Sequence, residues 1–364
     1  MPGIYIHIPF CDGKCPYCDF YSLRGDNDLL ERYTRALCER IARWPGERLP
    51  AETVYFGGGT PNLLGAPRLA RVLKAVARRF ALSEQAEITL EANPTHVDRE
   101  FFRQAREAGF NRLSLGLQSA NEEDLRLLGR AHTREDAAQA VENARAAGFE
   151  NLSLDLMLAL PGSTLESLGR SVEFAASLEP EHLSAYLLKV EEGTPFAVRG
   201  VASLEGDEAA EQYLFLVQRL GELGYPQYEI SNFARPGRES RHNLVYWRDE
   251  EYLGFGPAAH SFFQGRRFYW PRDLAGFLRG DKPVPDGPGG DFQEFAMLGL
   301  RLTEGLTRER CRERFDAAGE AQLDRLLERA RKLPGNLMQI QTDSLRLTPE
   351  GFLVSNLVLG ELVG

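Results

Sequence analysis

The stretch IPFCDGKCPYCDFYS, residues 8–22, carries three of the five cysteines of this 364-residue chain. Cys11, Cys15 and Cys18 follow the pattern C-x₃-C-x₂-C. They come directly after a short apolar run, residues 4–8, which predicts a strand. Structural zinc sites use four protein ligands, whereas this cluster supplies three thiols. The stretch therefore predicts a metal or redox site, in the loop after the first strand, with one ligand position left open.

Three kinds of site compete for these cysteines. The segment CPYC (15–18) has the form of a thiol redox motif, but that interpretation leaves Cys11 unexplained. A zinc site would take His7 as its fourth ligand, yet the paired C-x₂-C halves of structural zinc sites are absent from the sequence. A [4Fe–4S] cluster bound through three thiolates leaves one iron open, to which a small molecule can bind through nitrogen and oxygen donors.

Short apolar runs alternate with longer helical patterns between residues 3 and 230. This alternation predicts parallel strands joined by crossover helices, such as those expected over 67–80 and 134–148. A repeat supports the prediction, because AGFNRLSLGL (108–117) recurs as AGFENLSLDL (147–156). The expected fold class is α/β, a partial (βα)₆ barrel of the TIM type. The expected strands are 4–8, 54–56, 87–91, 112–117, 151–157 and 182–187.

Polar residues occupy the carboxyl ends of several expected strands, where barrels bind their ligands. GGGTP (57–61) follows the second strand, and glycines there let the backbone approach a ligand closely. Glu91 ends the third strand and Gln118 the fourth, while Asp155 lies inside the apolar fifth strand. Each residue alone is compatible with a turn or a cap. Together they favour a binding site, because buried polar groups are costly in an ordinary core.

Composition limits the classes of function. Hydrophobic residues make up 43% and charged residues 26%, as in a globular protein. A net charge of −10 without a lysine or arginine block argues against nucleic acid as a main partner. We expect neither a signal peptide nor a membrane span, since the sequence shows neither pattern. The few cysteines favour a reducing cytoplasm, with Cys38 and Cys311 as ordinary helical thiols.

The character of the sequence changes after residue 229. Residues 231–261 are rich in aromatic residues, glycine and histidine, which predicts a long irregular segment, and KPVPDGPGGD (282–291) is typical of a linker. The remainder predicts helices, a short hairpin and a last helix, a small, mainly helical, winged-helix-like domain. The expected division is a barrel (1–230), a central segment with linker (231–288) and a C-terminal domain (289–364).

Motifs that carry a family resemblance run in order along residues 4–261. They are IYIHIPFCDGKCPYCDF, YFGGGTPNLL, ITLEANP, LSLGLQS, LGRAHT, LDLMLALPG, YEISNFARPG and RHNLVYW. In these motifs the chain resembles the radical S-adenosylmethionine (SAM) superfamily. Within it, the chain is similar to the proteins related to oxygen-independent coproporphyrinogen III oxidase (HemN). The resemblance implies that the amino and carboxylate groups of SAM chelate the open iron of a [4Fe–4S] cluster.

The resemblance also implies roles for single residues. Cys11, Cys15 and Cys18 would bind the cluster, and SAM would lie among residues from several strands. The SAM residues it implies are Tyr5 and Tyr17 beside the cluster and adenosine, Gly58, Gly59, Thr60 and Glu91 at the amino end, Arg130 at the carboxylate, and Gln118 and Asp155 at the ribose.

Two functions separate within this group. The oxidase has an extension before the first strand and a further cysteine two positions after the third, where this chain has Phe20. The motif HNxxYW, here residues 242–247, instead resembles the heme-chaperone branch. Imidazole is a common axial ligand of heme iron, so His242 would bind the iron while Tyr246 and Trp247 face the macrocycle. The competing interpretation is that these side chains plug the barrel mouth. His260 is a weaker heme candidate, expected to pack or to hydrogen-bond.

The branch implies a cytoplasmic protein that binds heme and delivers it to heme-requiring client proteins, respiratory enzymes among them. The alternative is an enzyme that oxidatively decarboxylates the propionates of coproporphyrinogen III, and a third class is a radical SAM enzyme for another substrate. The cofactors implied are a [4Fe–4S] cluster, SAM and heme. The sequence leaves open the clients, the cleavage of SAM, transient contact with a membrane surface, and the oligomeric state, a dimer included.

Overall fold

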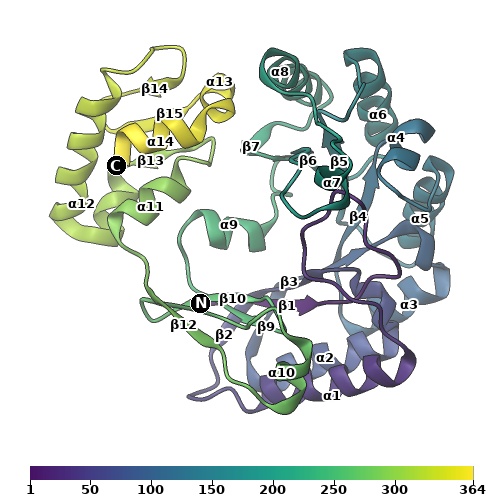
Figure 1. Ribbon diagram of the computed structural model, residues 1–364. Coiled ribbons are helices and arrows are strands. Elements are labelled where there is room, and N and C mark those ends of the chain that lie inside the picture. The colour runs from purple at the N-terminus through teal and green to yellow at the C-terminus, as the bar shows by residue number, and fades with distance from the viewer. Residues whose placement is uncertain (364) are drawn as a thin grey trace.

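A computed structural model, which describes residues 1–363, contains a mixed sheet with six consecutive parallel strands at its centre (Figure 1). These strands lie side by side in chain order, so each neighbouring pair is joined by a crossover. All six strands expected from the sequence are confirmed, and their order is that of a partial barrel. They are β1 (Gly3–Ile8), β2 (Pro50–Gly58), β3 (Ala81–Ala92), β4 (Arg112–Gln118), β5 (Leu152–Leu158) and β6 (His182–Leu187).

Crossover helices cover the outer face of this sheet (Figure 1). Their first turns are capped by side chains such as Asp26, Asp98 and Thr133, which accept hydrogen bonds from backbone N–H groups. Gly109 ends its helix with a φ of 112°, a left-handed conformation that favours glycine. The crossover helices are α1 (Asn27–Ala42), α2 (Ala66–Arg79), α3 (Arg99–Ala108), α4 (Glu122–Leu127), α5 (Arg134–Ala146) and α6 (Leu165–Ser177). Two further helices, α7 (Pro195–Val198) and α8 (Gly206–Glu222), follow β6.

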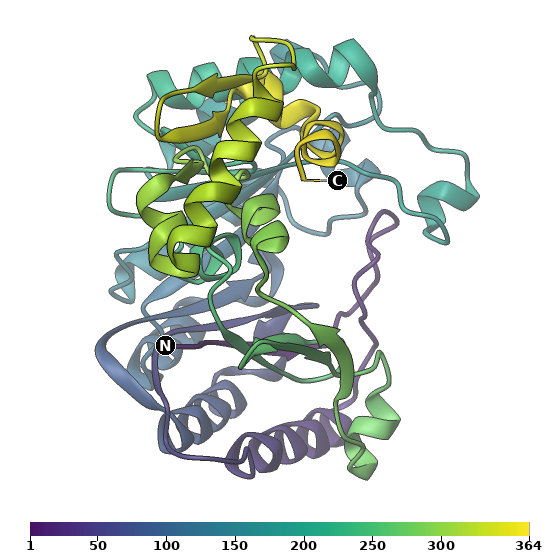
Figure 2. The same ribbon diagram turned by 90° about the vertical axis from the view of Figure 1, so that its left-hand side faces the viewer.

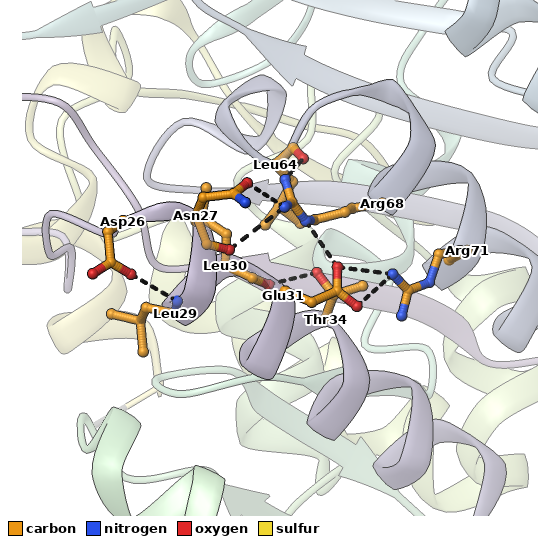
Figure 3. Close-up of polar contacts among 9 residues, drawn as sticks. All are labelled: Asp26, Asn27, Leu29, Leu30, Glu31, Thr34, Leu64, Arg68 and Arg71. Carbon is orange, nitrogen blue, oxygen red and sulfur yellow. Dashed lines mark hydrogen bonds and ion pairs between the residues drawn. The ribbon is translucent and has the colours of Figure 1, made fainter.

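Ion pairs join α1 to α2 on the outside of the barrel (Figure 3). Glu31 of α1 accepts hydrogen bonds from Arg68 at 3.1 Å and from Arg71 at 2.6 Å. Because Glu31 and Arg71 are about half exposed, solvent screens these pairs and they contribute little to stability. The fully buried side chains of Leu37 and Leu69 belong to the same core, and burial of such residues dominates the packing of the helices.

Alternation along the strands separates an apolar face from a polar face. Ile6, Phe56 and Leu115 are fully buried within the core that the helices share. The opposite face, which we call the lumen, carries polar or aromatic side chains from every parallel strand. The lumen residues are Tyr5, His7, Thr53, Tyr55, Glu87, Thr89, Glu91, Arg112, Ser114, Ser153, Asp155, His182 and Ser184. Since burying polar groups is costly, this face is suited to a ligand rather than to a hydrophobic core.

Further strands extend the sheet at both edges of the parallel set, beside β1 and beside β6. β9 (Tyr252–Phe255) pairs in parallel with β1, and β8 (Asn232–Ala234) pairs antiparallel with β6. The expectation of a long irregular segment over 231–261 is therefore wrong, and the expected linker 282–291 contributes β12. These strands are short and are stabilised by pairing with distant segments, which a local pattern does not reveal. The remaining elements here are β7 (Gln227–Glu229), α9 (Arg241–Trp247), β10 (His260–Phe263), β11 (Arg266–Tyr269), α10 (Leu274–Arg279) and β12 (Val284–Pro288).

The C-terminal elements form a small helical unit around a three-stranded sheet of order β13-β15-β14. The expected hairpin followed by a helix is confirmed. This unit contacts the barrel through α13 against α8 and contacts α9 through α11 (Figures 1 and 2). Its elements are α11 (Phe292–Gly299), β13 (Leu306–Thr307), α12 (Arg308–Ala330), β14 (Met338–Ile340), β15 (Ser344–Leu347), α13 (Pro349–Leu353) and α14 (Ser355–Val363).

Candidate cluster, SAM and heme site

The cysteine loop follows β1 and lies against two other lumen-facing segments. Cys11, Cys15 and Cys18 are half-buried free thiols. Cys11 Sγ lies 3.4 Å from Thr60 Oγ1 after β2, and Arg130 Nη1 donates to Cys15 Sγ at 3.6 Å. Among the described residues, no three His, Cys, Asp or Glu side chains are placed to hold a single metal ion. A [4Fe–4S] cluster has a different requirement, because each thiolate binds a different iron atom.

His7, the candidate fourth zinc ligand, is occupied by hydrogen bonds within the lumen. Tyr5 Oη lies 3.0 Å from His7 Nδ1, and His7 Nε2 lies 3.3 Å from the carbonyl oxygen of Tyr21. Burial lowers the pKa of His7 to about 4, so the ring is neutral at physiological pH. A Cβ at Gly58 would lie 2.6 Å from the ring. The imidazole therefore supports the turn after β2 and has no nitrogen free for a metal.

The glycine-rich turn after β2 approaches the cysteine loop through its backbone. Gly59 N–H donates to Ile8 O at 2.9 Å, and Thr60 N–H donates to Phe10 O at 2.7 Å. A Cβ at Gly59 would lie 2.6 Å from Phe10 O, so a side chain at this position would push the turn away from the loop. The glycine-rich turn therefore lies directly against the cysteine loop.

Glu91 lies beside this turn, as the resemblance implies. Its Oε1 accepts from Tyr55 Oη at 2.7 Å, and its Oε2 accepts from Gly58 N–H at 3.3 Å. Burial raises the pKa of Glu91 to about 7, against the two hydrogen bonds, which lower it. A carboxylate with this pKa becomes charged near neutral pH and is suited to bind a cationic ammonium group.

Arg130 reaches the cysteine loop from the segment after β4. Its Nη2 donates to Gly116 O at 3.4 Å, and a Cβ at Gly116 would lie only 2.6 Å from that nitrogen. The buried Nε of Arg130 has no partner among the described residues. A guanidinium with an unused donor next to the cysteines fits an anionic group such as a carboxylate. Nearby, Gln118 adopts a φ of 69°, an unusual conformation outside glycine that clusters at functional sites.

Asp155 faces the lumen from β5, where it accepts a hydrogen bond from Ser114 Oγ at 3.1 Å. Burial raises the pKa of Asp155, while hydrogen bonds from Ser184 and Ser114 lower it. Tyr17 lies on the cysteine loop near Phe196, with ring centroids 6.3 Å apart. The expected SAM residues thus come from several separate segments, and most of them border one end of the lumen. Tyr5 is the exception, because it lies level with Tyr55, one step deeper, against His7 and His242.

Helix α9 carries the HNxxYW motif into the open side of the barrel, between the parallel sheet and the C-terminal unit (Figure 1). His242 is 1% exposed, and its ring lies 5.2 Å from that of Tyr55 and 6.4 Å from that of Tyr5. Its Nδ1 lies 2.8 Å from Thr53 Oγ1, and its Nε2 lies 2.8 Å from Tyr246 Oη. Burial lowers the pKa of His242 to about 3. The imidazole is therefore neutral, and binding iron requires one hydrogen bond to break.

The motif is divided between two environments. Tyr246 contacts His242 inside the barrel, whereas Trp247 lies under the guanidinium of Arg301 at 5.7 Å, on the side of the C-terminal unit. The expected pair of aromatic faces is thus not adjacent in this structure. His260 is exposed and stacks on Tyr269 with centroids 5.3 Å apart, which agrees with its expected packing role.

Glu229 lies fully buried beneath Trp247 and provides a test of the packing here. Burial raises its pKa to about 7, although hydrogen bonds from Ser231 N–H and the Asn232 side chain lower it. The folded state therefore favours the protonated form, and the free energy of unfolding should fall by roughly 3 kcal/mol as pH rises from about 4.5 to about 7.

We expect Glu229→Gln to remove this contribution, which urea unfolding at pH 5, 6, 7 and 8 would measure. Glu91 keeps its own slope in the variant, so the pH dependence should weaken without vanishing. A variant with the wild-type pH dependence would show that Glu229 is ionised throughout.

Several lumen residues escaped the sequence prediction. Tyr55, which orients Glu91, and Ser114, which binds Asp155, are examples. Arg112 and Thr89 are further lumen residues that no motif indicated. The alternation of side chains along each strand could have indicated them, because it places every second residue on the lumen face.

Comparisons with known proteins identify the family of this chain. The family model described as the radical SAM superfamily matches residues 5–175. The chain is 35% identical to heme chaperone HemW of Bacillus subtilis, with both chains covered completely, and 38% identical to heme chaperone HemW of Escherichia coli, with 84% of each chain covered. The solved structure of Escherichia coli coproporphyrinogen III oxidase (HemN), a radical SAM enzyme, matches with a TM-score of 0.82 and 22% identity, covering 100% of this chain and 90% of that one.

The structural match shows a shared fold, while the identities over the whole length define the relationship more closely. The cysteine loop, the glycine-rich turn and the HNxxYW helix lie at the positions described above. The chain belongs to the heme chaperone HemW family of the radical SAM superfamily.

Proposed function

We propose that this protein binds heme and delivers it to heme-requiring client proteins, respiratory enzymes among them, in the cytoplasm. It would carry a [4Fe–4S] cluster on Cys11, Cys15 and Cys18, and SAM against Glu91 and Arg130. The observation that carries the proposal is the position of α9, whose neutral His242 lies at the lumen wall beside Tyr5 and Tyr55. Neutral imidazole is a common axial ligand of heme iron.

The proposal requires His242 to become accessible. In this structure both ring nitrogens are hydrogen-bonded, and the N–H groups of Arg241 and His242 donate to Glu87 of β3 at 3.2 and 3.1 Å. Heme binding would therefore displace α9 or its Tyr246 hydroxyl.

No helix among residues 1–363 is long and apolar enough to cross a membrane. Contact with membrane-bound clients would therefore occur at the surface of this chain.

Heme titration separates the ligand from its hydrogen-bond partner. We expect His242→Ala to lose saturable binding of one heme per chain or to change the spectrum of the bound heme. Tyr246→Phe keeps the imidazole and removes the hydroxyl that competes for Nε2, so its heme affinity should equal or exceed that of the wild type. Anaerobic titration of hemin into the reconstituted proteins, followed by absorption, measures both. Identical spectra for wild type and His242→Ala would show that another group binds the iron.

The alternative function is decarboxylation of coproporphyrinogen III. Phe20 stands where the oxidase has a further cysteine, and the fold alone does not separate the two activities. We expect no protoporphyrinogen when the reconstituted protein is incubated anaerobically with reductant, SAM and coproporphyrinogen III. Its formation would establish an enzyme and overturn the proposal of a chaperone alone.

A further inference from the structure

A buried arginine in the lumen has a guanidinium nitrogen without a hydrogen-bond partner among the described residues. Arg112, the first residue of β4, is 2% exposed, and its Nε finds no hydrogen-bond acceptor among the described residues. Among residues 1–363, no carboxylate oxygen lies within 4.0 Å, the limit for an ion pair, of the Arg112 guanidinium. Burying a cation without a counter-ion costs several kcal/mol. A stable fold that keeps such a group has another use for it.

A second unpartnered group lies directly beside the first. Thr89 of β3 is opposite Arg112 in the register of the parallel pair, is fully buried, and has no hydrogen-bond partner for its hydroxyl. Two residues further along, Glu91 and Ser114 are also opposite each other, and both belong to the SAM end of the lumen. Thr89 and Arg112 therefore face the same lumen, one step deeper.

No group around Arg112 forms an ion pair with it, although its charge lowers the pKa of Glu91 and of Asp155. His182 is bound to Ser153 and Tyr228, and His242 to Thr53 and Tyr246, so both rings are neutral and fully engaged. The carboxyls nearest to the site along the strands are committed elsewhere, and Glu87 accepts hydrogen bonds from the N–H groups of Arg241 and His242. Glu91 binds Tyr55 and Gly58, and Asp155 binds Ser114. The deep lumen thus contains a fixed positive charge and a free hydroxyl.

We propose that Arg112 and Thr89 form a binding site for a carboxylate group, and that the group is a propionate of heme. This rests on the proposed heme-binding function. A guanidinium presents parallel N–H donors that match the two oxygens of a carboxylate, and the threonine hydroxyl supplies another donor. Heme combines a flat apolar ring with carboxylates on one edge, so a buried cation beside aromatic side chains suits it.

The register of the sheet places the two ends of such a ligand. Tyr55, Thr89 and Arg112 are consecutive across β2, β3 and β4, and His242 stacks on Tyr55. Arg112 is thus two strands, on the order of 10 Å, from Tyr55, on which the expected iron ligand His242 stacks. This separation is comparable with the distance from the iron to the carboxylate edge of a porphyrin. Displacement of α9 would free His242 and open the route to Arg112 together.

The test compares heme with its dimethyl ester, which lacks the carboxylates. We expect the wild-type reconstituted protein to bind heme at least about tenfold more tightly than the ester, since a bidentate pair with a buried arginine is worth more than about 1.4 kcal/mol. Arg112→Met should reduce heme affinity to that of the ester and leave ester affinity unchanged. Arg170→Met, which removes an exposed guanidinium on α6, is the matched control and should behave as the wild type.

Further measurements keep the interpretation unambiguous. Arg112→Met should retain SAM binding and unfold at the same temperature as the wild type or higher, because an unpaired buried charge is removed. If it does not fold, Thr89→Val should weaken heme binding several-fold without affecting the ester. A heme-to-ester ratio that neither variant changes would overturn the carboxylate site, as would loss of SAM binding in Arg112→Met. Absence of saturable heme binding by the wild type would instead contradict the proposed function itself.

Discussion

Replacing Cys15 with alanine is expected to remove the iron–sulfur cluster. Its thiol accepts a hydrogen bond from Arg130, and only two other thiols belong to the loop. A cluster held by three thiolates has no spare protein ligand, so loss of one leaves a second iron without a protein ligand. Iron and acid-labile sulfide of the anaerobically reconstituted variant should fall below about a tenth of the wild-type level, with loss of the broad visible absorbance.

The chain offers a matched control for this experiment. Cys38 is a half-buried free thiol of α1, outside the loop, so Cys38→Ala removes one cysteine without touching the expected ligand set. This variant should retain wild-type iron and sulfide. Full retention by Cys15→Ala would contradict the assignment of the three cysteines, and equal losses in both variants would point to a general effect of thiol removal on reconstitution.

SAM affinity is expected to depend on pH through Glu91. Because the pKa of its carboxyl is raised to about 7, the carboxylate that would bind the SAM ammonium is increasingly protonated below that pH. The affinity for SAM should therefore fall by up to about tenfold for each unit of pH below 7 and level off above 8. Equilibrium dialysis of labelled SAM against the reconstituted protein between pH 5.5 and 8.5 measures this dependence.

Two variants identify the group that titrates. Glu91→Gln should lower SAM affinity at pH 8 by at least about tenfold and remove the pH dependence, since no charge remains to titrate. Tyr55→Phe keeps the carboxylate but deletes the hydrogen bond that lowers its pKa, so the midpoint should move to higher pH. A pH dependence that survives in Glu91→Gln would assign the titration to another lumen group.

Local patterns were sufficient for the barrel and for the position of the cysteine loop after its first strand. Alternating apolar residues determine a strand wherever one face is buried, and the repeat at 108–117 and 147–156 showed that similar units follow each other. The spacing of Cys11, Cys15 and Cys18 is a local property as well, because a loop that binds one cluster must hold its ligands close along the chain. The division of the chain at residues 230 and 288 stays a prediction.

The later part of the chain was less predictable because its elements depend on distant partners. β9 exists as a strand because β1 offers its edge, and β12 exists because β11 is extended beside it. Neither segment has an apolar pattern long enough to indicate a strand by itself. The segment 231–261 therefore looked irregular, although it contributes strands to the sheet and the helix α9.

The sequence by itself determined the family, the parallel barrel and the identity of the residues expected at the cluster and SAM. The tertiary structure decided which polar side chains of the barrel already have hydrogen-bond partners and which have none. It placed His242 between Thr53 and Tyr246 and Trp247 on the C-terminal side. It also left Arg112 Nε and the Thr89 hydroxyl without hydrogen-bond partners among the described residues. The physical reason is that hydrogen bonding and charge pairing of buried groups depend on which strands and helices pack together. Strand register, rather than local sequence, determines which residues of neighbouring strands lie side by side.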